Sequence, residues 1–173
     1  MNDSKELAAL LAATKVLVVD DEHYMRKVVR TLLMSIGVRT IYEAPDGPTG
    51  LETIRTMAPD VVIVDWQMPG LDGAAFVRMV RSPQTFPFPN IPIIMLTGHG
   101  ERSRVVEAVQ IGVNEFLLKP VSSKALHSRM VSILTKPRTV VQAGTYYGPA
   151  PRNMATAMHA DGDDAVTQLV LVN

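Results

Sequence analysis

The sequence predicts an α/β fold in which helices cover both faces of a parallel sheet, and three observations support this prediction. Short apolar runs rich in β-branched residues recur without alternation, as expected for strands buried on both faces. Segments with a helical spacing of apolar residues separate these runs, and strict alternation of strand and helix is typical of a doubly wound sheet. Four apolar runs end at chemically reactive side chains, which a parallel sheet gathers at one edge.

Five segments are predicted strands. They are residues 15–20, 38–44, 59–65, 93–97 and 113–119. The first and third, KVLVVD and PDVVIVD, share one pattern, and both end in aspartate. From residue 15 onward, five strands alternate with five helices in about 120 residues. This is the flavodoxin-like size class, for which the expected strand order is 2-1-3-4-5.

Apolar residues spaced three and four apart predict the helices. These cover residues 3–13, 23–36, 46–57, 72–81, 101–111 and 122–135. In the second helix, an apolar residue recurs at every fourth position, namely Tyr24, Val28, Leu32 and Ile36, with Val29 and Leu33 beside them. Asp46 and Asp72 are predicted N-caps, because a short carboxylate side chain accepts a hydrogen bond from the first helical turn.

Two segments depart from this alternation. Residues 82–92, SPQTFPFPNIP, contain four prolines and are predicted to form an irregular, extended connector. After residue 137 no long periodic run occurs until 166–172, VTQLVLV, which is a candidate strand. We therefore divide the chain into an N-terminal helical extension at 1–13, a main domain at 14–136 and a C-terminal tail at 137–173.

The tail allows two interpretations. An exposed apolar strand at 166–172 would be prone to aggregation. We therefore expect it to pack on the main domain or on a partner subunit, as an exchanged arm in a homodimer, and deletion of 137–173 would then change the oligomeric mass. The alternative is disorder of residues 139–165.

The composition excludes several classes of function. Among the 173 residues, Lys+Arg and Asp+Glu both number 17, so the net charge of zero gives no general attraction to nucleic acid or to an anionic membrane. The absence of cysteine excludes a disulfide framework and a thiolate site. The apolar stretch at 7–13 is too short to span a membrane and has the wrong flanks for a signal peptide. We expect a cytoplasmic protein without nucleic-acid or membrane partners.

The side chains at the strand ends have the composition of a phosphoryl-accepting site. Such a site needs a nucleophile, a divalent cation and neutralisation of the transferred oxygens. Asp65 ends the central strand and is the predicted nucleophile. Asp20 and Asp21 end the neighbouring strand, and together with Asp65 they are predicted to hold Mg²⁺, which prefers oxygen ligands. The backbone carbonyl of Gln67 is a further candidate ligand.

Two more residues complete the predicted site. Lys119 would pair with Asp65 before modification and with a phosphoryl oxygen afterwards, while Thr97 would donate its hydroxyl to another phosphoryl oxygen. The bond from Lys119 to the following proline is a candidate cis peptide. Taken singly, these residues are more simply a helix cap, a loop hydroxyl and a surface charge, but their occurrence at consecutive strand ends favours one joint site. His23 and His99 are not expected to bind metal, because no second ligand lies at a suitable spacing.

The motifs that contain these residues closely resemble the receiver domain of two-component response regulators, the family that includes chemotaxis receivers. They are VLVVDDE (16–22), EAPDG (43–47), PDVVIVDWQMPGLDG (59–73), IPIIMLTG (91–98) and FLLKP (116–120). The resemblance covers about residues 14–135 and implies that Lys119 is the lysine of the family pattern.

The resemblance also implies roles for the other site residues. It implies phosphorylation of Asp65 by a sensor histidine kinase, with Mg²⁺ among Asp20, Asp21 and Asp65. Thr97 is implied as the switch hydroxyl. Phe116 falls on the aromatic switch position, where the ring is expected to turn inward on phosphorylation; an ordinary half-buried strand aromatic is the alternative.

The chain departs from the family pattern in three places. Gln67 and His99 occupy positions that tune phosphoryl lifetime in this family and differ from the chemotaxis pattern, so no lifetime can be carried over. The connector at 82–92 is longer than usual. The N-terminal helix and the tail lie outside the resemblance, although YYGPAPR (146–152) is similar to tails that follow some stand-alone receivers.

We expect a stand-alone receiver that acts as a phosphorylation-controlled switch rather than as an enzyme, with chemistry limited to phosphoryl acceptance and its own dephosphorylation. Phosphorylation adds roughly −1.5 to −2 charges. It is expected to bias the Thr97 loop and the face formed by 101–111, 113–119 and 122–135. The expected partners are a sensor histidine kinase or a histidine phosphotransfer protein, and a downstream protein.

Three alternatives are open. One is a phosphorelay intermediate or phosphate sink, for which phosphoryl transfer back to a histidine protein is diagnostic. Another is a magnesium phosphohydrolase with an aspartyl intermediate, but such enzymes typically have a second aspartate two residues after the nucleophile, where this chain has Gln67. The third is DNA binding through the tail, which is opposed by its charge of two arginines against three aspartates.

Overall fold

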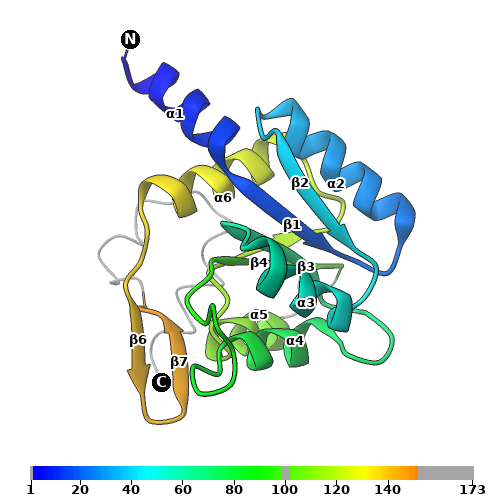
Figure 1. Cartoon of the computed structure of the whole chain (residues 1–173), viewed down its shortest axis with the longest axis vertical. Coiled ribbons are helices and arrows are strands. Elements are labelled where there is room, and N and C mark those ends of the chain that lie inside the picture. The colour runs from blue at the N-terminus through cyan, green and yellow to red at the C-terminus, as the bar shows by residue number, and fades with distance from the viewer. Residues whose placement is uncertain (1, 99–101, 152–173) are drawn as a thin grey trace.

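Five parallel strands form one sheet with the order β2-β1-β3-β4-β5, which confirms the predicted fold class and strand order. The structure, a computed structural model, describes residues 2–98 and 102–151. The strands are β1 (Lys15–Val19), β2 (Thr40–Ala44), β3 (Val61–Asp65), β4 (Ile93–Thr97) and β5 (Glu115–Leu118). Because every pairing within this sheet is parallel, the carboxyl ends of all five strands lie at one edge (Figure 1).

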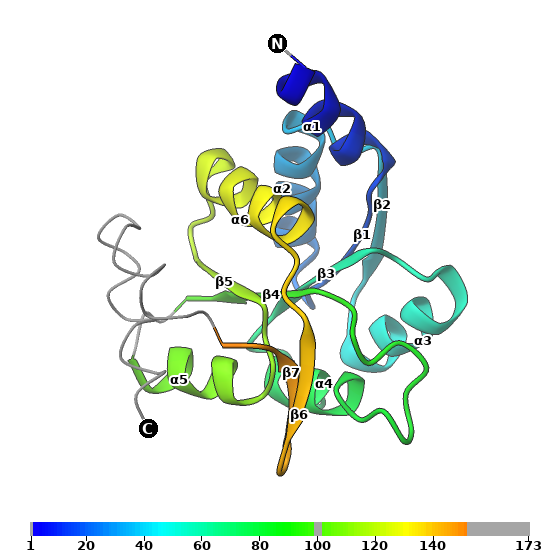
Figure 2. The same cartoon turned by 90° about the vertical axis from the view of Figure 1, so that its left-hand side faces the viewer.

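Helices cover both faces of the sheet. They are α1 (Asn2–Ala13), α2 (His23–Ser35), α3 (Gly47–Met57), α4 (Gly73–Val80), α5 (Arg102–Gln110) and α6 (Ser123–Thr135). Figure 2 shows α1, α2 and α6 on one side of the sheet and α3, α4 and α5 on the other. None of the described helices is both long enough and apolar enough to cross a bilayer.

Two apolar cores lie on opposite faces of the sheet. Val16 and Val18 of β1 pack into the core beneath α2 and α6, whereas Leu17 and Val19 pack into the core beneath α3 and α4. Successive side chains of a strand point to opposite faces, so a strand between two cores is apolar throughout. Every residue of β3 and β4 is buried, which accounts for the unbroken apolar runs in the sequence.

Strands β2 and β5 begin two residues later than predicted, because the preceding residues complete a helix end. The backbone N–H of Val38 donates to the carbonyl of Leu33 at 3.0 Å, and Gly37 takes a φ of 105°. This pattern is a glycine-based C-terminal helix cap. Gly112 and Val113 end α5 in the same way, so neither segment is free to extend its strand.

The apolar face of α2 is centred on Val29 and Leu33, which were predicted to lie beside the row of residues spaced four apart. Val29 and Leu33 are fully buried, whereas Tyr24 is 74% exposed. With 3.6 residues per turn, a strict spacing of four drifts around the helix by about 40° at each step. Tyr24 is thereby carried off the face that Val29 and Leu33 bury, and the prediction was wrong at this residue.

The two predicted aspartate caps are confirmed. The Oδ1 atom of Asp46 accepts a hydrogen bond from the Thr49 N–H at 2.8 Å, and Oδ1 of Asp72 accepts one from the Ala75 N–H at 2.8 Å. Each cap satisfies one donor of a first helical turn, which would otherwise lack a partner. The Asp72 cap also sets the start of α4, which follows the loop after Asp65.

The described part of the tail forms an antiparallel hairpin that the sequence analysis did not predict. Its strands are β6 (Val140–Ala143) and β7 (Tyr146–Pro149). A Cβ placed on Gly112 would lie 2.6 Å from the Tyr147 carbonyl oxygen, so the hairpin packs closely on the loop between α5 and β5. The disordered alternative is therefore wrong for 140–149. The candidate strand at 166–172 lies outside the described residues.

Arg81, at the end of α4, connects the irregular segment at 82–92 to the same loop. Its buried guanidinium donates to the carbonyls of Pro89, Ile91 and Gly112 and to Oδ1 of Asn114, at 2.6–2.9 Å. Burial lowers the pKa of Arg81 to about 10, so the side chain is still charged at neutral pH. Two of these bonds satisfy carbonyls of the segment at 82–92, whose four prolines have no N–H to donate.

Candidate functional site

Three carboxylates meet at the carboxyl edge of the sheet, where the sequence predicts them. Asp65 is the last residue of β3, and Asp20 and Asp21 directly follow β1. One oxygen of each carboxylate lies within 4.8 Å of the others. Asp20 and Asp65 are buried, and Asp21 is exposed. The cluster therefore has a buried floor and one side open to solvent.

Lys119 lies against two of these carboxylates. Its Nζ atom is 2.9 Å from Oδ1 of Asp65 and 3.7 Å from Oδ2 of Asp20. The lysine directly follows β5, and its backbone N–H donates to the carbonyl of Thr97 at 2.8 Å, which fixes it beside β4. The peptide bond between Lys119 and Pro120 is cis, as the sequence analysis anticipated. The cation and the three carboxylates thus belong to one cluster.

The pKa values of the buried carboxyl groups reflect this crowding. Burial, together with the nearby charges of Asp65 and Asp21, raises the pKa of Asp20 to about 6, against the opposing effects of the Glu22 N–H and of Lys119. Burial also raises the pKa of Asp65, although its hydrogen bond to Lys119 opposes this change. Three carboxylates beside a single lysine retain an excess of negative charge, which a second cation would relieve.

The surroundings of Lys119 favour its charged form, whereas those of Asp20 and Asp65 favour the neutral form of the carboxyl group. Burial alone would lower its pKa, but the hydrogen bond and charge of Asp65, with the charge of Asp20, raise it. Lys119 therefore stays protonated at neutral pH. A permanently charged ammonium next to Asp65 suits the role of neutralising oxygens that are transferred to this carboxylate.

The donor set fits a divalent cation. Oδ2 of Asp20 is completely buried and has no hydrogen-bond partner, and it lies among the three clustered carboxylates. A buried carboxylate oxygen without a donor carries a large desolvation cost. An oxygen-preferring metal ion such as Mg²⁺ would satisfy this atom, and Mg²⁺ is commonly bound through one or two carboxylates plus water.

Backbone contacts hold the cluster in place. The Glu22 N–H donates to Oδ1 of Asp20 at 2.9 Å, and the Asp20 N–H donates to the carbonyl of Ala44 at 3.1 Å. On the other side, the Gly73 N–H donates to the carbonyl of Trp66 at 2.9 Å. Gly73 lies so close to Asp65 and Trp66 that a Cβ there would lie 2.9 Å from the Trp66 Cα.

The remaining predicted residues lie around the cluster. Thr97 is buried at the end of β4, next to the strand that carries Asp65. Phe116 is half-buried on β5 opposite Met95 and packs against the core beneath α3 and α4. Gln67 is exposed in the loop after β3, so its role as a carbonyl ligand stays a prediction. His99 lies outside the described residues.

A surface recess of about 400 Å³ adjoins the cluster. Its lining residues come from the loop after β3 and from α5, and they are Trp66, Gln67, Met68, Pro69, Asp72 and Arg104. The Arg104 guanidinium lies over the Trp66 ring, 5.6 Å from its centroid. Arg104 could not be identified from the sequence, because a single arginine in a polar helical stretch is indistinguishable from a solvated surface charge.

The protein is thus a flavodoxin-like α/β protein with three aspartates and a lysine at the carboxyl ends of its strands, and comparison with known proteins specifies the family. Residues 16–131 match the response regulator receiver domain. The chain belongs to this family, whose general role is that of phosphoacceptor in two-component signalling.

Individual relatives are similar over nearly their whole length. The chemotaxis protein CheY of Pseudomonas aeruginosa is 33% identical over 122 residues, which is 70% of this chain and 97% of CheY. CheY1 of Helicobacter pylori is 36% identical over 69% of this chain and 96% of its own. Among solved structures, chemotaxis protein CheY4 of Vibrio cholerae matches with a TM-score of 0.63 and 31% identity, covering 70% of this chain and 98% of that chain.

Proposed function

We propose that Asp65 accepts a phosphoryl group and that Asp20, Asp21 and Asp65 hold Mg²⁺ at the site of transfer. One observation carries the proposal. Lys119 Nζ lies 2.9 Å from Asp65 Oδ1 within a cluster of three carboxylates. A carboxylate at the open edge of the sheet, beside a fixed ammonium, is suited to act as a nucleophile whose product is more negative than the reactant.

The donor we propose is the phosphohistidine of a sensor histidine kinase or of a histidine phosphotransfer protein. An oxygen of Asp65 forms a bond to phosphorus while the phosphorus–nitrogen bond to the imidazole breaks. The imidazole leaves with that electron pair and takes up a proton. Lys119 then moves its hydrogen bond from the carboxylate to a phosphoryl oxygen.

Mg²⁺ bound at the cluster would supply further positive charge to the transferred oxygens. Asp20 is suited to hold it because its buried Oδ2 has no hydrogen-bond donor. Asp21 is exposed and can adjust to the incoming ion. The backbone carbonyl of Gln67 is the fourth protein ligand that we propose.

We further propose that the phosphorylated state is read out through Thr97 and Phe116. The hydroxyl of Thr97 would donate to a phosphoryl oxygen, and the ring of Phe116 would then turn inward. Their places on adjacent strands support this coupling, since Phe116 pairs with Met95, two residues before Thr97. The surface formed by α5, β5 and α6 would present the change to a downstream protein.

Intact-mass measurement tests the proposal. The full-length protein is incubated with phosphoramidate or acetyl phosphate, with and without Mg²⁺, beside the Asp65→Asn variant. We expect one phosphoryl group on the wild-type protein only when Mg²⁺ is present, and none on the variant. A phosphoryl group that persists on Asp65→Asn would contradict the assignment of the acceptor. Beryllofluoride binding, which mimics the product, separates rapid hydrolysis from a failure to react.

A further inference from the structure

We infer that Arg26 is a positioning residue for the magnesium site, acting through the main chain of Asp20. The inference rests on the proposed function and adds a residue to it. Arg26 lies on α2 and is not among the acidic or phosphoryl-binding residues considered so far. It binds the backbone next to the carboxylate cluster and connects that backbone to the edge strand β2.

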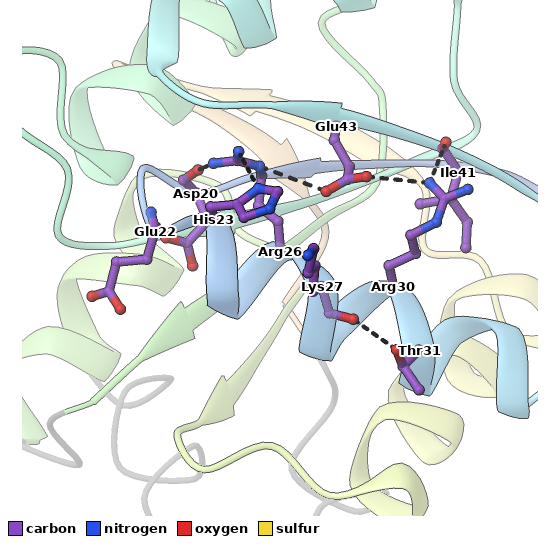
Figure 3. A network of polar contacts seen from close by, with 9 residues as sticks. All are labelled: Asp20, Glu22, His23, Arg26, Lys27, Arg30, Thr31, Ile41 and Glu43. Carbon is purple, nitrogen blue, oxygen red and sulfur yellow. Dashed lines mark hydrogen bonds and ion pairs between the residues drawn. The ribbon is translucent and has the colours of Figure 1, made fainter.

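Two guanidinium nitrogens of Arg26 donate hydrogen bonds, and the third forms an ion pair. Nη1 donates to the main-chain carbonyl of Asp20 at 2.7 Å, and Nη2 donates to Nδ1 of His23 at 3.3 Å. Nε lies 3.6 Å from Oε1 of Glu43 on β2. Figure 3 shows the guanidinium between Asp20 and Glu43, with the Asp20 carboxylate pointing away from it. The Arg26 side chain is only 13% exposed, so this arrangement is largely shielded from solvent.

The carbonyl of Asp20 belongs to the peptide unit that joins Asp20 to Asp21. A hydrogen bond to this carbonyl therefore fixes the plane from which the backbone of Asp21 continues. Asp21 is the exposed member of the cluster, and its orientation depends more on its backbone than on surrounding side chains. The Glu22 N–H also donates to Asp20 Oδ1. This bond and the contact from Arg26 together hold the backbone from Asp20 to Glu22.

Arg26 acts by position rather than by neutralising the cluster. Among the described residues, its ion pair is with Glu43 and not with Asp20, Asp21 or Asp65. The guanidinium therefore leaves the carboxylate oxygens available to a metal ion. A planar group with several donors is needed to reach a carbonyl and a carboxylate at once, and the single ammonium of lysine cannot replace it.

Arg30 provides a matched control on the same helix. Its Nη1 lies 3.2 Å from Oε2 of Glu43 and donates to the Ile41 carbonyl at 3.4 Å. Arg30 thus pairs with the same glutamate as Arg26, from the other side, and among the described residues it makes no hydrogen bond to Asp20 (Figure 3). Arg26→Met and Arg30→Met each remove an ion pair with Glu43, but only Arg26→Met removes the bond to Asp20.

The experiment measures the Mg²⁺ dissociation constant of the full-length protein. Trp66 is the only tryptophan, follows Asp65 directly and is 8% exposed, so its fluorescence reports on the site. Isothermal titration calorimetry gives the same constant independently. Loss of a contact that orients a metal ligand is expected to weaken binding by about 10-fold or more in Arg26→Met and in Arg26→Lys. In Arg30→Met we expect a change of no more than about twofold, as for an exposed ion pair.

The possible outcomes separate this inference from the proposed function. Weakened Mg²⁺ binding in both Arg26 variants, with Arg30→Met near wild type and urea midpoints similar for the two methionine variants, supports the positioning role. Equal Mg²⁺ affinity in wild type and Arg26→Met, or full rescue by Arg26→Lys, overturns it while leaving the proposed function intact. A wild-type protein without saturable Mg²⁺ binding overturns both, and the Asp21→Asn variant shows whether any signal originates at the cluster.

Discussion

Asp20 carries a charge in a place where burial opposes it. Its side chain is fully buried, and its folded pKa of about 6 lies above the ordinary value of 3.8. The folded protein therefore binds this proton more tightly than the unfolded chain does. The resulting stabilisation is complete below pH 3.8 and is lost as the pH rises through about 6. At neutral pH the ionised Asp20 carboxylate lowers the free energy of unfolding unless a cation is bound beside it.

A pH dependence follows from this ionisation. Between about pH 5 and pH 7 in the absence of metal, ionisation of Asp20 is expected to lower the free energy of unfolding by about 1 kcal/mol, out of about 3 kcal/mol over the whole titration, at about 1.4 kcal/mol per pKa unit. Because Mg²⁺ favours the ionised carboxylate, its stabilising effect should grow over the same range. Urea unfolding at both pH values, with and without Mg²⁺, measures this. Asp20→Asn should flatten the dependence, and an equally steep dependence in that variant would rule out this origin.

Gly73 is required where α4 starts against the end of β3. In Gly73→Ala the new methyl group would meet the backbone of Asp65 and Trp66, neither of which can yield like a side chain. We expect a loss of about 1–3 kcal/mol in the free energy of unfolding and weaker Mg²⁺ binding. Gly98→Ala is the control, since a Cβ there has no neighbour within 4 Å. Equal stability of the two variants, measured by urea unfolding, would contradict this packing argument.

Among single residues, the clustered side chains could be predicted from the sequence, but the residues that hold their backbone in place could not. The acidic residues follow apolar strands, so the rule that parallel strands end at one edge was sufficient to bring Asp20, Asp65 and Lys119 together. Arg26 could not be predicted in the same way. Its partners are a backbone carbonyl six residues earlier and Glu43 on another strand, and neither leaves a pattern in the sequence around Arg26.

Among the elements, the end of α4 and the connector after it depend on Arg81. Its four acceptors come from residues 89–91 and 112–114, and no periodicity in the sequence connects these segments. Arg81→Met is expected to lower the free energy of unfolding by at least about 3 kcal/mol, because buried carbonyl groups lose their donor. Arg81→Lys should not restore the loss, since one ammonium cannot reach all four acceptors.

Arg78 is the control for this prediction. It lies three residues earlier on α4, and its pair with Glu107, at 3.0 Å, involves a side chain that is 55% exposed. Arg78→Met should therefore change the free energy of unfolding by less than about 1 kcal/mol. Similar urea midpoints for Arg78→Met and Arg81→Met would mean that the guanidinium network of Arg81 does not hold the connector.

The five strands and six helices were predictable because both cores impose a strong pattern on them. The hairpin of β6 and β7 was not. Its strands have four residues each, β7 contains Gly148 and Pro149, and glycine and proline usually indicate a loop. It is ordered by contacts that are distant in sequence, such as those of Arg138 with the carbonyls of Asn114 and Ala150.

In the whole molecule, the acidic cluster lies at the carboxyl ends of the strands and the hairpin lies near their amino ends. The cluster follows the carboxyl ends of β1 and β3, whereas Arg138 contacts Asn114, whose N–H binds the carbonyl of Ile93 at the start of β4. The described part of the tail is thus remote from the reactive side chains. The homodimer, the cytoplasmic location and the domain boundaries at 13 and 136 stay predictions, as does the choice between an output switch and a phosphorelay intermediate.

We propose that Asp65, and no other carboxylate of the cluster, accepts the phosphoryl group. Borohydride reduction of the phosphorylated protein converts an aspartyl phosphate to homoserine, which peptide mass spectrometry can locate in the chain. We predict homoserine at position 65 only, and only after incubation with phosphodonor and Mg²⁺. Homoserine at position 20 or 21, or its formation at position 65 without phosphodonor, would contradict the assignment of Asp65 as the acceptor.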